Sequence, residues 1–250
     1  MNKQLVLYPI LNSHKNIIAF STTKQTLRHP APRFTGDLPN VFTENRKELA
    51  NILGVNVNQL VFPRQTHTNC VVALQKTPAN EIKETDALLT NQPGICICVQ
   101  TADCVPILLF DPLKNVIAAI HAGWRGTVKR IAEVAVREMV AKFGTSAENI
   151  LAVIGPSIGP DAYEVGNEVV EEVLKSIPQA KNTIRENNSG KFHFNLWEAN
   201  RQILMNCGVN SQNIEIAGEC SFTKKEKYFS ARRDGIDTGR TVSAIMLLTK

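Results

Sequence analysis

The chain has 250 residues, of which 43% are hydrophobic and 20% are charged, and it carries a formal net charge of +5. This composition supports a sizeable hydrophobic core and excludes an intrinsically disordered chain. The basic residues are scattered along the sequence, which argues against a nucleic-acid partner and leaves room for a local anion pocket. Because no repeat or Gly/Ser-rich linker divides the sequence, we predict one domain over residues 1–250.

The N-terminal segment does not have the pattern of a targeting signal, so we expect a cytoplasmic protein. It has one lysine and a short apolar run that Pro9 interrupts. No stretch approaches the roughly 18 consecutive apolar residues of a membrane helix, and we expect no membrane partner. Six cysteines are too few for a dense disulfide scaffold, and Cys96 and Cys98 are predicted to be buried thiols in a strand.

The first part of the chain predicts a long loop, a helix and several short strands. Residues 21–40 are rich in Thr, Pro and Gly and are typical of a loop, which at this length is often functional. Residues 40–54 have a helical pattern that ends at Gly54, with four apolar residues directed inward: Val41, Leu49, Ile52 and Leu53. Strands are expected over 60–67, 70–75, 86–90 and 95–100.

Two apolar runs at the centre of the sequence predict a β-hairpin. The runs cover 105–110 and 116–120, and the segment between them begins with Asp-Pro, a turn signal. Cys104 precedes the first run and His121 follows the second, so both lie at the open end of the hairpin. If Phe110 pairs with Val116, Cys104 and His121 are nearly opposite, with their Cα atoms about 5 Å apart.

The second half of the chain predicts helices separated by strands. Apolar residues recur at helical spacing over 128–143, with Thr127 as the N-cap and Gly144 as the end. Further helices are expected over about 166–177 and over 195–208, where Asn195 and Glu198 have the spacing of a capping box. Strands are expected over 150–155, 213–217 and 242–248.

The order of these elements predicts the fold class. Several strands come in succession and the helices come mainly later, which favours an α+β layered sandwich with a mixed, largely antiparallel sheet flanked by helices. The sequence contains neither a GxGxxG nor a P-loop pattern, and this argues against a dinucleotide-binding or P-loop fold.

A third donor side chain completes a candidate metal site. His67 ends the predicted strand 60–67, and two imidazoles with one thiolate are plausible zinc ligands. Three protein ligands leave one position open, which is typical of a catalytic site. Two alternatives stay open at this point: a metal-free nucleophile and base formed by Cys104 and His121, or a buried thiol beside two ordinary histidines.

Two arginine-containing segments are candidate anion sites. Arg125 lies in the segment GWRGT, directly before the predicted helix 128–143, and helix N-termini favour phosphate. Arg232 and Arg233 lie in residues 230–240, which hold three arginines and read as a rim loop for an anionic or polar substrate. The alternatives are a simple tight turn for the first segment and an ion-paired surface loop for the second.

At these residues the sequence resembles the YfiH/DUF152 family, described first as multicopper polyphenol oxidases or laccases and later as purine nucleoside phosphorylases. The segments that carry the resemblance span about residue 36 to the C-terminus: GDLPNVFTENR, RQTHTN, TADCVPILLFDP, HAGWRGT, IGPSIGPDAYEVG and SARRDGIDTGR. The resemblance implies a sandwich-like fold and a zinc ion bound by His67, Cys104 and His121. It also implies phosphorolysis of adenosine, inosine, guanosine and S-methyl-5'-thioadenosine, with adenosine deamination as a side activity.

The function predicted from these features is a zinc-dependent purine nucleoside phosphorylase. Phosphate would be held by Arg125, with Arg232 and Arg233 at the rim, and Asp103 is a candidate acid/base beside Cys104. The expected partners are purine nucleosides and phosphate, and the expected state is a monomer or a weak homodimer.

Two alternative enzymes remain. One is a copper-dependent polyphenol oxidase, although multicopper oxidases need many histidines and this chain has five. The other is a hydrolase that uses Cys104 and His121 on cell-wall precursors. The sequence departs from the family pattern at Thr68, where glycine is common, and in residues 21–40, so substrate contacts from that loop are not carried over.

Overall fold

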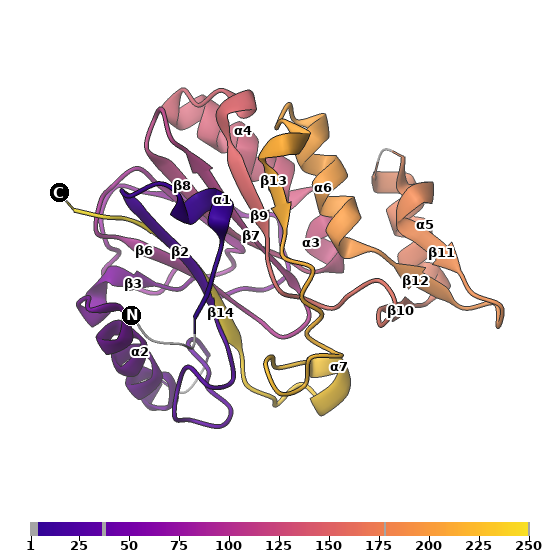
Figure 1. The fold of residues 1–250 in the computed structure, drawn as a ribbon, viewed down its shortest axis with the longest axis horizontal. Helices are drawn as coiled ribbons and strands as arrows, with labels where there is room; N and C mark the ends of the chain where they lie inside the picture. The colour runs from indigo at the N-terminus through magenta and orange to yellow at the C-terminus, as the bar shows by residue number, and fades with distance from the viewer. Residues whose placement is uncertain (1–4, 37–38, 178, 250) are drawn as a thin grey trace.

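The computed structural model describes residues 5–36, 39–177 and 179–249, and in these residues the strands form three sheets (Figure 1). The five-stranded sheet has the order β1 (Leu5–Leu7), β2 (Ile17–Thr22), β14 (Thr241–Leu247), β6 (Cys96–Thr101), β3 (Leu60–Val61). The six-stranded sheet has the order β13 (Ile214–Ile216), β9 (Leu151–Ile154), β7 (Val105–Asp111), β8 (Val116–Ala122), β5 (Ala87–Thr90), β4 (Val71–Leu74). A small sheet has the order β10 (Glu164–Val165), β12 (Phe192–Phe194), β11 (Ile184–Glu186).

Helices cover the outer faces of the two large sheets. The α-helices are α1 (Pro9–Asn12), α2 (Pro39–Leu53), α3 (Trp124–Val128), α4 (Ile131–Phe143), α5 (Asn167–Ser176), α6 (Leu196–Asn206) and α7 (Ala231–Asp234). Short 3₁₀ helices cover Val57–Gln59, Ala147–Asn149, Ala180–Thr183 and Ser211–Asn213. Figure 1 shows α2 beside the five-stranded sheet and α4 and α6 on the far side of the six-stranded sheet. None of the helices in the described residues is long and apolar enough to cross a membrane.

The central strands are buried on both faces, which explains their nearly continuous apolar sequence. Along β7, Leu108 and Phe110 pack between the two large sheets, together with residues of β6 and β14. Ile107 and Leu109 point the other way, into the core that α4 and α6 cover. A third cluster packs α2 against the five-stranded sheet through Leu49.

The α+β layered sandwich and its largely antiparallel pairing are confirmed, but the expectation of a single sheet is wrong. The predicted strands 60–67 and 70–75 belong to different sheets. The first is reduced to β3, because Pro63 lacks the N–H that would continue the ladder. Because β6, β7 and β8 are apolar on both faces, the strands stack as two sheets with a shared core.

The predicted hairpin exists, but its register differs by one residue from the prediction. Val116 pairs with Asp111 and not with Phe110, so Pro106 is the residue opposite His121. The Asp111 carboxylate accepts hydrogen bonds from the N–H groups of the turn residues Leu113 and Lys114, at 2.9 and 3.2 Å, which draws Asp111 into the strand. Cys104 and His121 still lie at the same end of the hairpin, as predicted.

The helix predicted over 128–143 is interrupted. Lys129 and Arg130 separate α3 from α4, and Arg130 adopts a left-handed conformation with φ 56°. Thr127 is not an N-cap, because it is buried within α3 and its hydroxyl accepts a hydrogen bond from Asn200 Nδ2 at 3.1 Å. The predicted end at Gly144 is confirmed, with φ 66°.

The other helices follow the predicted boundaries closely. Asn195 caps α6 by accepting a hydrogen bond from Glu198 N at 3.0 Å, but its own N–H donates to the Thr183 carbonyl, so only half of the capping box forms. In α2, Leu49 is buried as predicted, while the orientation predicted for Val41 lies outside the described side chains. The sequence patterns did not predict α1, α7, β1, β2 or the small sheet. Apart from β2, each of these helices and strands has four residues or fewer.

Candidate metal centre

Three loop and strand ends bring the predicted metal ligands together. His67 lies in the loop after β3, Cys104 in the turn between β6 and β7, and His121 near the end of β8. One ligand atom from each of the three residues lies within 4.8 Å of the others. The His67 Nε2 to Cys104 Sγ distance is 3.8 Å, and the two imidazole rings are 4.9 Å apart at 73°. This group could hold a metal ion.

Gly123 leaves the space in which these side chains meet. In the register of the hairpin it follows the pair Val105 and Ala122, and it is therefore the residue beside Cys104. A Cβ at position 123 would lie 2.8 Å from Cys104 Sγ and 3.1 Å from His67 Cδ2. A side chain at this position would therefore displace two of the three ligands.

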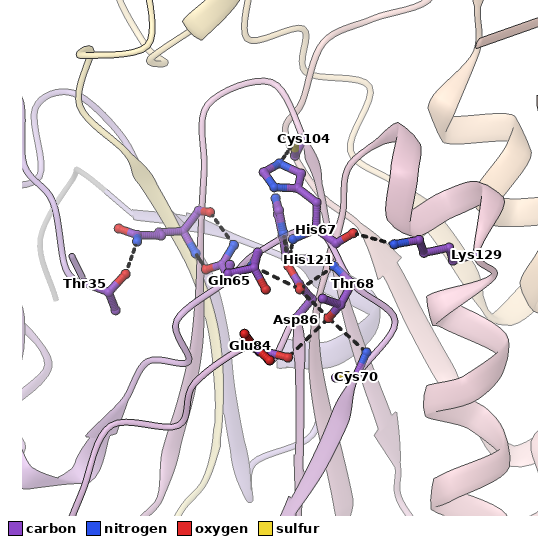
Figure 2. A network of polar contacts seen from close by, with 12 residues as sticks. Thr35, Gln65, His67, Thr68, Cys70, Glu84, Asp86, Cys104, His121 and Lys129 are labelled. Carbon is purple, nitrogen blue, oxygen red and sulfur yellow. Dashed lines mark hydrogen bonds and ion pairs between the residues drawn. The ribbon is translucent and has the colours of Figure 1, made fainter. Parts of the chain in front are cut away.

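Asp86 holds His121 and the loop that carries His67 (Figure 2). Its Oδ1 accepts a hydrogen bond from His121 Nδ1 at 2.7 Å and one from His67 N at 3.0 Å. Its Oδ2 accepts hydrogen bonds from Thr66 N, Thr68 N and the Thr68 hydroxyl, at 3.2, 2.7 and 2.8 Å. Since Nδ1 of His121 is engaged, Nε2 is the nitrogen left for a metal, an arrangement that fixes ring orientation at metal sites.

The sequence analysis did not single out Asp86. The pairing of Ala87 with Ile120 places Asp86 directly beside His121, whose N–H donates to the Asp86 carbonyl at 2.7 Å. Asp86 is fully buried at the start of a strand whose other residues are apolar or Thr. A carboxylate opening such a strand is the signal that could have found it, because a buried charge requires partners.

Thr68 takes part in the same network. The Thr68 hydroxyl donates a hydrogen bond to Asp86 Oδ2 and accepts one from Cys70 N at 3.1 Å. His67 itself has a positive φ of 61°. The Asp86 contacts to 66–68 therefore hold a loop whose backbone conformation is otherwise unfavourable for a non-glycine residue.

The electrostatics of the centre favour a thiolate beside an imidazolium in the metal-free protein. Burial raises the pKa of Cys104, but the charge and hydrogen bonds of His121 and His67 outweigh it and lower that pKa to about 6. Burial lowers the pKa of His121, but the Cys104 charge and the Asp86 hydrogen bond raise it to about 9. Burial likewise opposes ionisation of Asp86, and contacts with His121 and Thr68 hold its pKa well below the usual range.

Asp103 is close to the centre but has a different set of partners. Its Oδ1 accepts a hydrogen bond from the Ser221 hydroxyl at 2.6 Å, and its Oδ2 accepts one from Arg232 N at 2.7 Å. The backbone of Asp103 has φ 91°. Asp103 therefore ties the turn that carries Cys104 to the segment that carries Arg232.

The three predicted anion-binding arginines differ in how free their side chains are. Arg125 is exposed and its guanidinium stacks on Trp124, 4.3 Å from the ring centre. Arg232 is exposed, donates to the Glu164 carbonyl at 3.0 Å and lies over the Tyr163 ring.

Arg233 is engaged within its own segment. It donates to the carbonyls of Ser221, Phe222 and Tyr228 and forms an ion pair with Asp234. These contacts hold the loop together around the Arg233 side chain.

Tyr163 contacts one of the exposed arginines, since the Arg232 guanidinium lies 5.3 Å from its ring centre. Burial raises the pKa of Tyr163, as do the charges of Cys104 and Asp103, while Arg232 and Arg125 oppose them. The phenol therefore lies within the electrostatic field of both the thiolate and the arginines. The sequence analysis quoted its motif but did not single out this residue.

Comparisons with known proteins agree with this architecture. The family model described as multi-copper polyphenol oxidoreductase laccase matches residues 32–248. A purine nucleoside phosphorylase of Bacteroides thetaiotaomicron is 38% identical over 98% of this chain and 97% of its own length. A protein named adenosine deaminase RL5, from an unknown prokaryotic organism, is 43% identical over 85% of this chain and 84% of its own length.

A solved structure supports the same assignment. The crystal structure of the hypothetical protein YfiH of Bacillus licheniformis has a TM-score of 0.90 and 30% sequence identity, covering 98% of this chain and 97% of that one. A structure described as DUF152, from Neisseria meningitidis, has a TM-score of 0.85. The chain therefore belongs to the YfiH/DUF152 family, whose model carries the laccase description.

Proposed function

We propose that this protein is a zinc-dependent purine nucleoside phosphorylase acting on adenosine, inosine, guanosine and S-methyl-5'-thioadenosine. The observation that carries the proposal is the convergence of His67, Cys104 and His121 on one centre beside exposed arginines. Relatives over nearly the whole chain carry the name purine nucleoside phosphorylase. We also propose that residues 1–250 act as one catalytic domain in the cytoplasm.

The donor set fits zinc. Two imidazoles and a thiolate suit this borderline-soft ion, and three protein ligands leave one position open. The orientation of His121 by Asp86 and the space left by Gly123 both suit a bound ion at this point. When bound, zinc would supply Lewis-acid polarisation at the open position.

The remaining residues bind and orient the substrates. Arg125 and Arg232 are the proposed phosphate ligands, because their guanidiniums are exposed and rest on the aromatic rings of Trp124 and Tyr163. Arg233 supports Arg232 by fixing the loop. Phosphate held here would attack the anomeric carbon of the ribose as the bond to the purine breaks, so the purine departs and ribose 1-phosphate forms.

Adenosine deamination is a second proposed activity of the same site. The name of the relative at 43% identity favours it. Asp103 is the proposed acid/base, and its hydrogen bond of 2.6 Å with the Ser221 hydroxyl connects it to a further proton carrier.

Two other functions are less well supported. The laccase description of the family model favours copper-dependent phenol oxidation, but the described residues contain one candidate metal group, whereas multicopper oxidation requires several ions. The thiolate and imidazolium favoured at Cys104 and His121 also suit a metal-free hydrolase acting on cell-wall precursors.

The decisive experiment measures metal and turnover on the same sample. Natively purified protein is analysed for zinc and copper, then incubated with adenosine and phosphate while adenine, ribose 1-phosphate and inosine are quantified. Adenine formation that requires both zinc and phosphate supports the proposal. Zinc-loaded protein that releases no purine base overturns the proposal. Substrate turnover that persists after removal of both His67 and the metal points to the metal-free hydrolase.

A further inference from the structure

Two further arginines, Arg33 and Arg240, converge on the loop that follows α7. Arg33 Nη2 donates to the Ile236 carbonyl at 2.7 Å, and Arg240 Nη2 donates to the same carbonyl at 3.0 Å. One oxygen atom thus brings two guanidiniums together. Arg33 comes from the loop after β2, in the region that departs from the family pattern, and Arg240 directly precedes β14.

The sheet register places this pair beside the metal centre. Thr241 of β14 pairs with Thr101 of β6, so Arg240 is the next residue along, beside Ala102. Ala102 is followed directly by the turn that contains Asp103 and Cys104. Burial and the charge of Arg33 lower the pKa of Arg240, and the charges of Cys104 and Asp103 partly oppose this shift, in keeping with their proximity.

The backbone around Arg33 is held rigidly. Arg240 N donates to the Pro32 carbonyl at 2.8 Å, and Asn45 Nδ2 donates to the Arg33 carbonyl at 3.0 Å. Gly239 packs so closely that a Cβ there would lie 2.7 Å from Phe229 Cε1 and 2.8 Å from Pro32 Cδ. The two segments therefore form one preorganised wall, which lowers the cost of ordering side chains when a ligand binds.

The two positive charges are only partly compensated. Burial lowers the pKa of Arg240, as does the charge of Arg33. Arg33 has a carboxylate neighbour, the exposed Asp237 at 3.6 Å. In the described part of the chain no ion pair is found for Arg240, whose Nη1 donates hydrogen bonds to the Thr238 and Gly239 carbonyls. The Asp103 carboxylate is already engaged by Ser221 and Arg232.

We propose that Arg33 and Arg240 form a second oxyanion subsite that takes a phosphoryl group. Among the residues that the structure describes, several guanidinium N–H groups have no acceptor, including Nε of both arginines. Two guanidiniums also offer more donors than the two oxygens of a carboxylate can use. The occupant is inorganic phosphate or the phosphate of a phosphomonoester. That this subsite serves the catalytic centre rests on the proposed function, whereas binding of phosphate by the two arginines does not require turnover.

The test is phosphate binding by the zinc-loaded full chain, measured by isothermal titration calorimetry without nucleoside. Arg33→Gln should weaken binding of inorganic phosphate by about tenfold, the loss expected for one charge-assisted hydrogen-bonding partner. Arg28→Gln is the matched control, because Arg28 lies in the same loop and its side chain is 97% exposed. Zinc content and the unfolding temperature of each variant are measured on the same samples.

The second arm identifies the source of the phosphoryl group. If Arg33→Gln weakens binding of adenosine 5'-monophosphate and leaves inorganic phosphate unchanged, the subsite takes a phosphomonoester. Arg240→Lys keeps the positive charge but should weaken binding of the same ligand, because lysine lacks the guanidinium fork. Unchanged binding of both ligands by folded Arg33→Gln protein overturns the proposal. A protein that binds phosphate at this wall but lacks phosphorolysis would refute the proposed function alone.

Discussion

Asp86 and Asp103 lie on two sides of the same centre and organise different halves of it. Asp86 is fully buried and holds the metal half, through His121 and the backbone of residues 66–68. Asp103 is partly exposed and holds the arginine half, through Ser221 and Arg232. The comparison teaches that sequence proximity to a ligand does not define a carboxylate's role. Asp103 adjoins Cys104, yet it is the distant Asp86 that orients a histidine.

The largest expected effect is on the metal half. Cys104→Ser should remove bound zinc and lower phosphorolysis by more than about 100-fold. Loss of a metal ligand has a larger effect than loss of a residue that only orients a ligand, which lowers metal affinity or activity by about 10-fold to 100-fold. Zinc measured by elemental analysis and adenine release provide the readout. Retention of stoichiometric zinc by this variant would show that Cys104 is not a ligand.

Asp86→Asn should lower zinc affinity by about 10-fold to 100-fold, the range seen for partners that orient metal-bound histidines. The neutral amide lacks the negative charge that strengthens the hydrogen bonds from His121 and from the three backbone N–H groups. Competition with a chromogenic chelator measures the affinity. Asp103→Asn is the comparison variant, and equal loss of zinc in both would break the division into two halves.

Two glycine substitutions test the metal half and the wall formed by Arg33 and Arg240 by steric means. Gly123→Ala places a Cβ 2.8 Å from Cys104 Sγ, and Gly239→Ala places one 2.7 Å from Phe229 Cε1 and 2.8 Å from Pro32 Cδ. The first should lower zinc affinity, and the second should raise the KM for phosphate by up to about 100-fold with zinc content unchanged, because each strain is about 1–3 kcal/mol. The opposite pattern would contradict the assignment.

The smallest effect is expected for Asp103→Asn. Loss of the charge weakens the hydrogen bonds to Ser221 and Arg232, each worth about 1.5–3 kcal/mol when one partner is charged. We expect a KM for phosphate about tenfold higher and unchanged zinc content. For deamination, in which Asp103 is the proposed acid/base, kcat should fall more than KM rises. An unchanged kcat for deamination would limit Asp103 to positioning.

Local sequence patterns determined the hairpin and therefore the meeting of Cys104 and His121. A short Asp-Pro turn forces two adjacent apolar runs to pair antiparallel, which places the residues flanking them at one end. The end of α4 at Gly144 was predictable for the same reason, since a glycine with φ 66° ends a helix through local backbone geometry.

Only the tertiary structure decided the partners of these ligands. Asp86 meets His121 because β5 pairs with β8, and Arg33 meets Arg240 because the loop after β2 runs beside β14. The division into two sheets and the interruption of the helix at Arg130 were also beyond local patterns. These outcomes depend on how segments far apart in the chain pack against one another. Apolar periodicity shows that a segment is buried, but it does not specify the segment against which it packs.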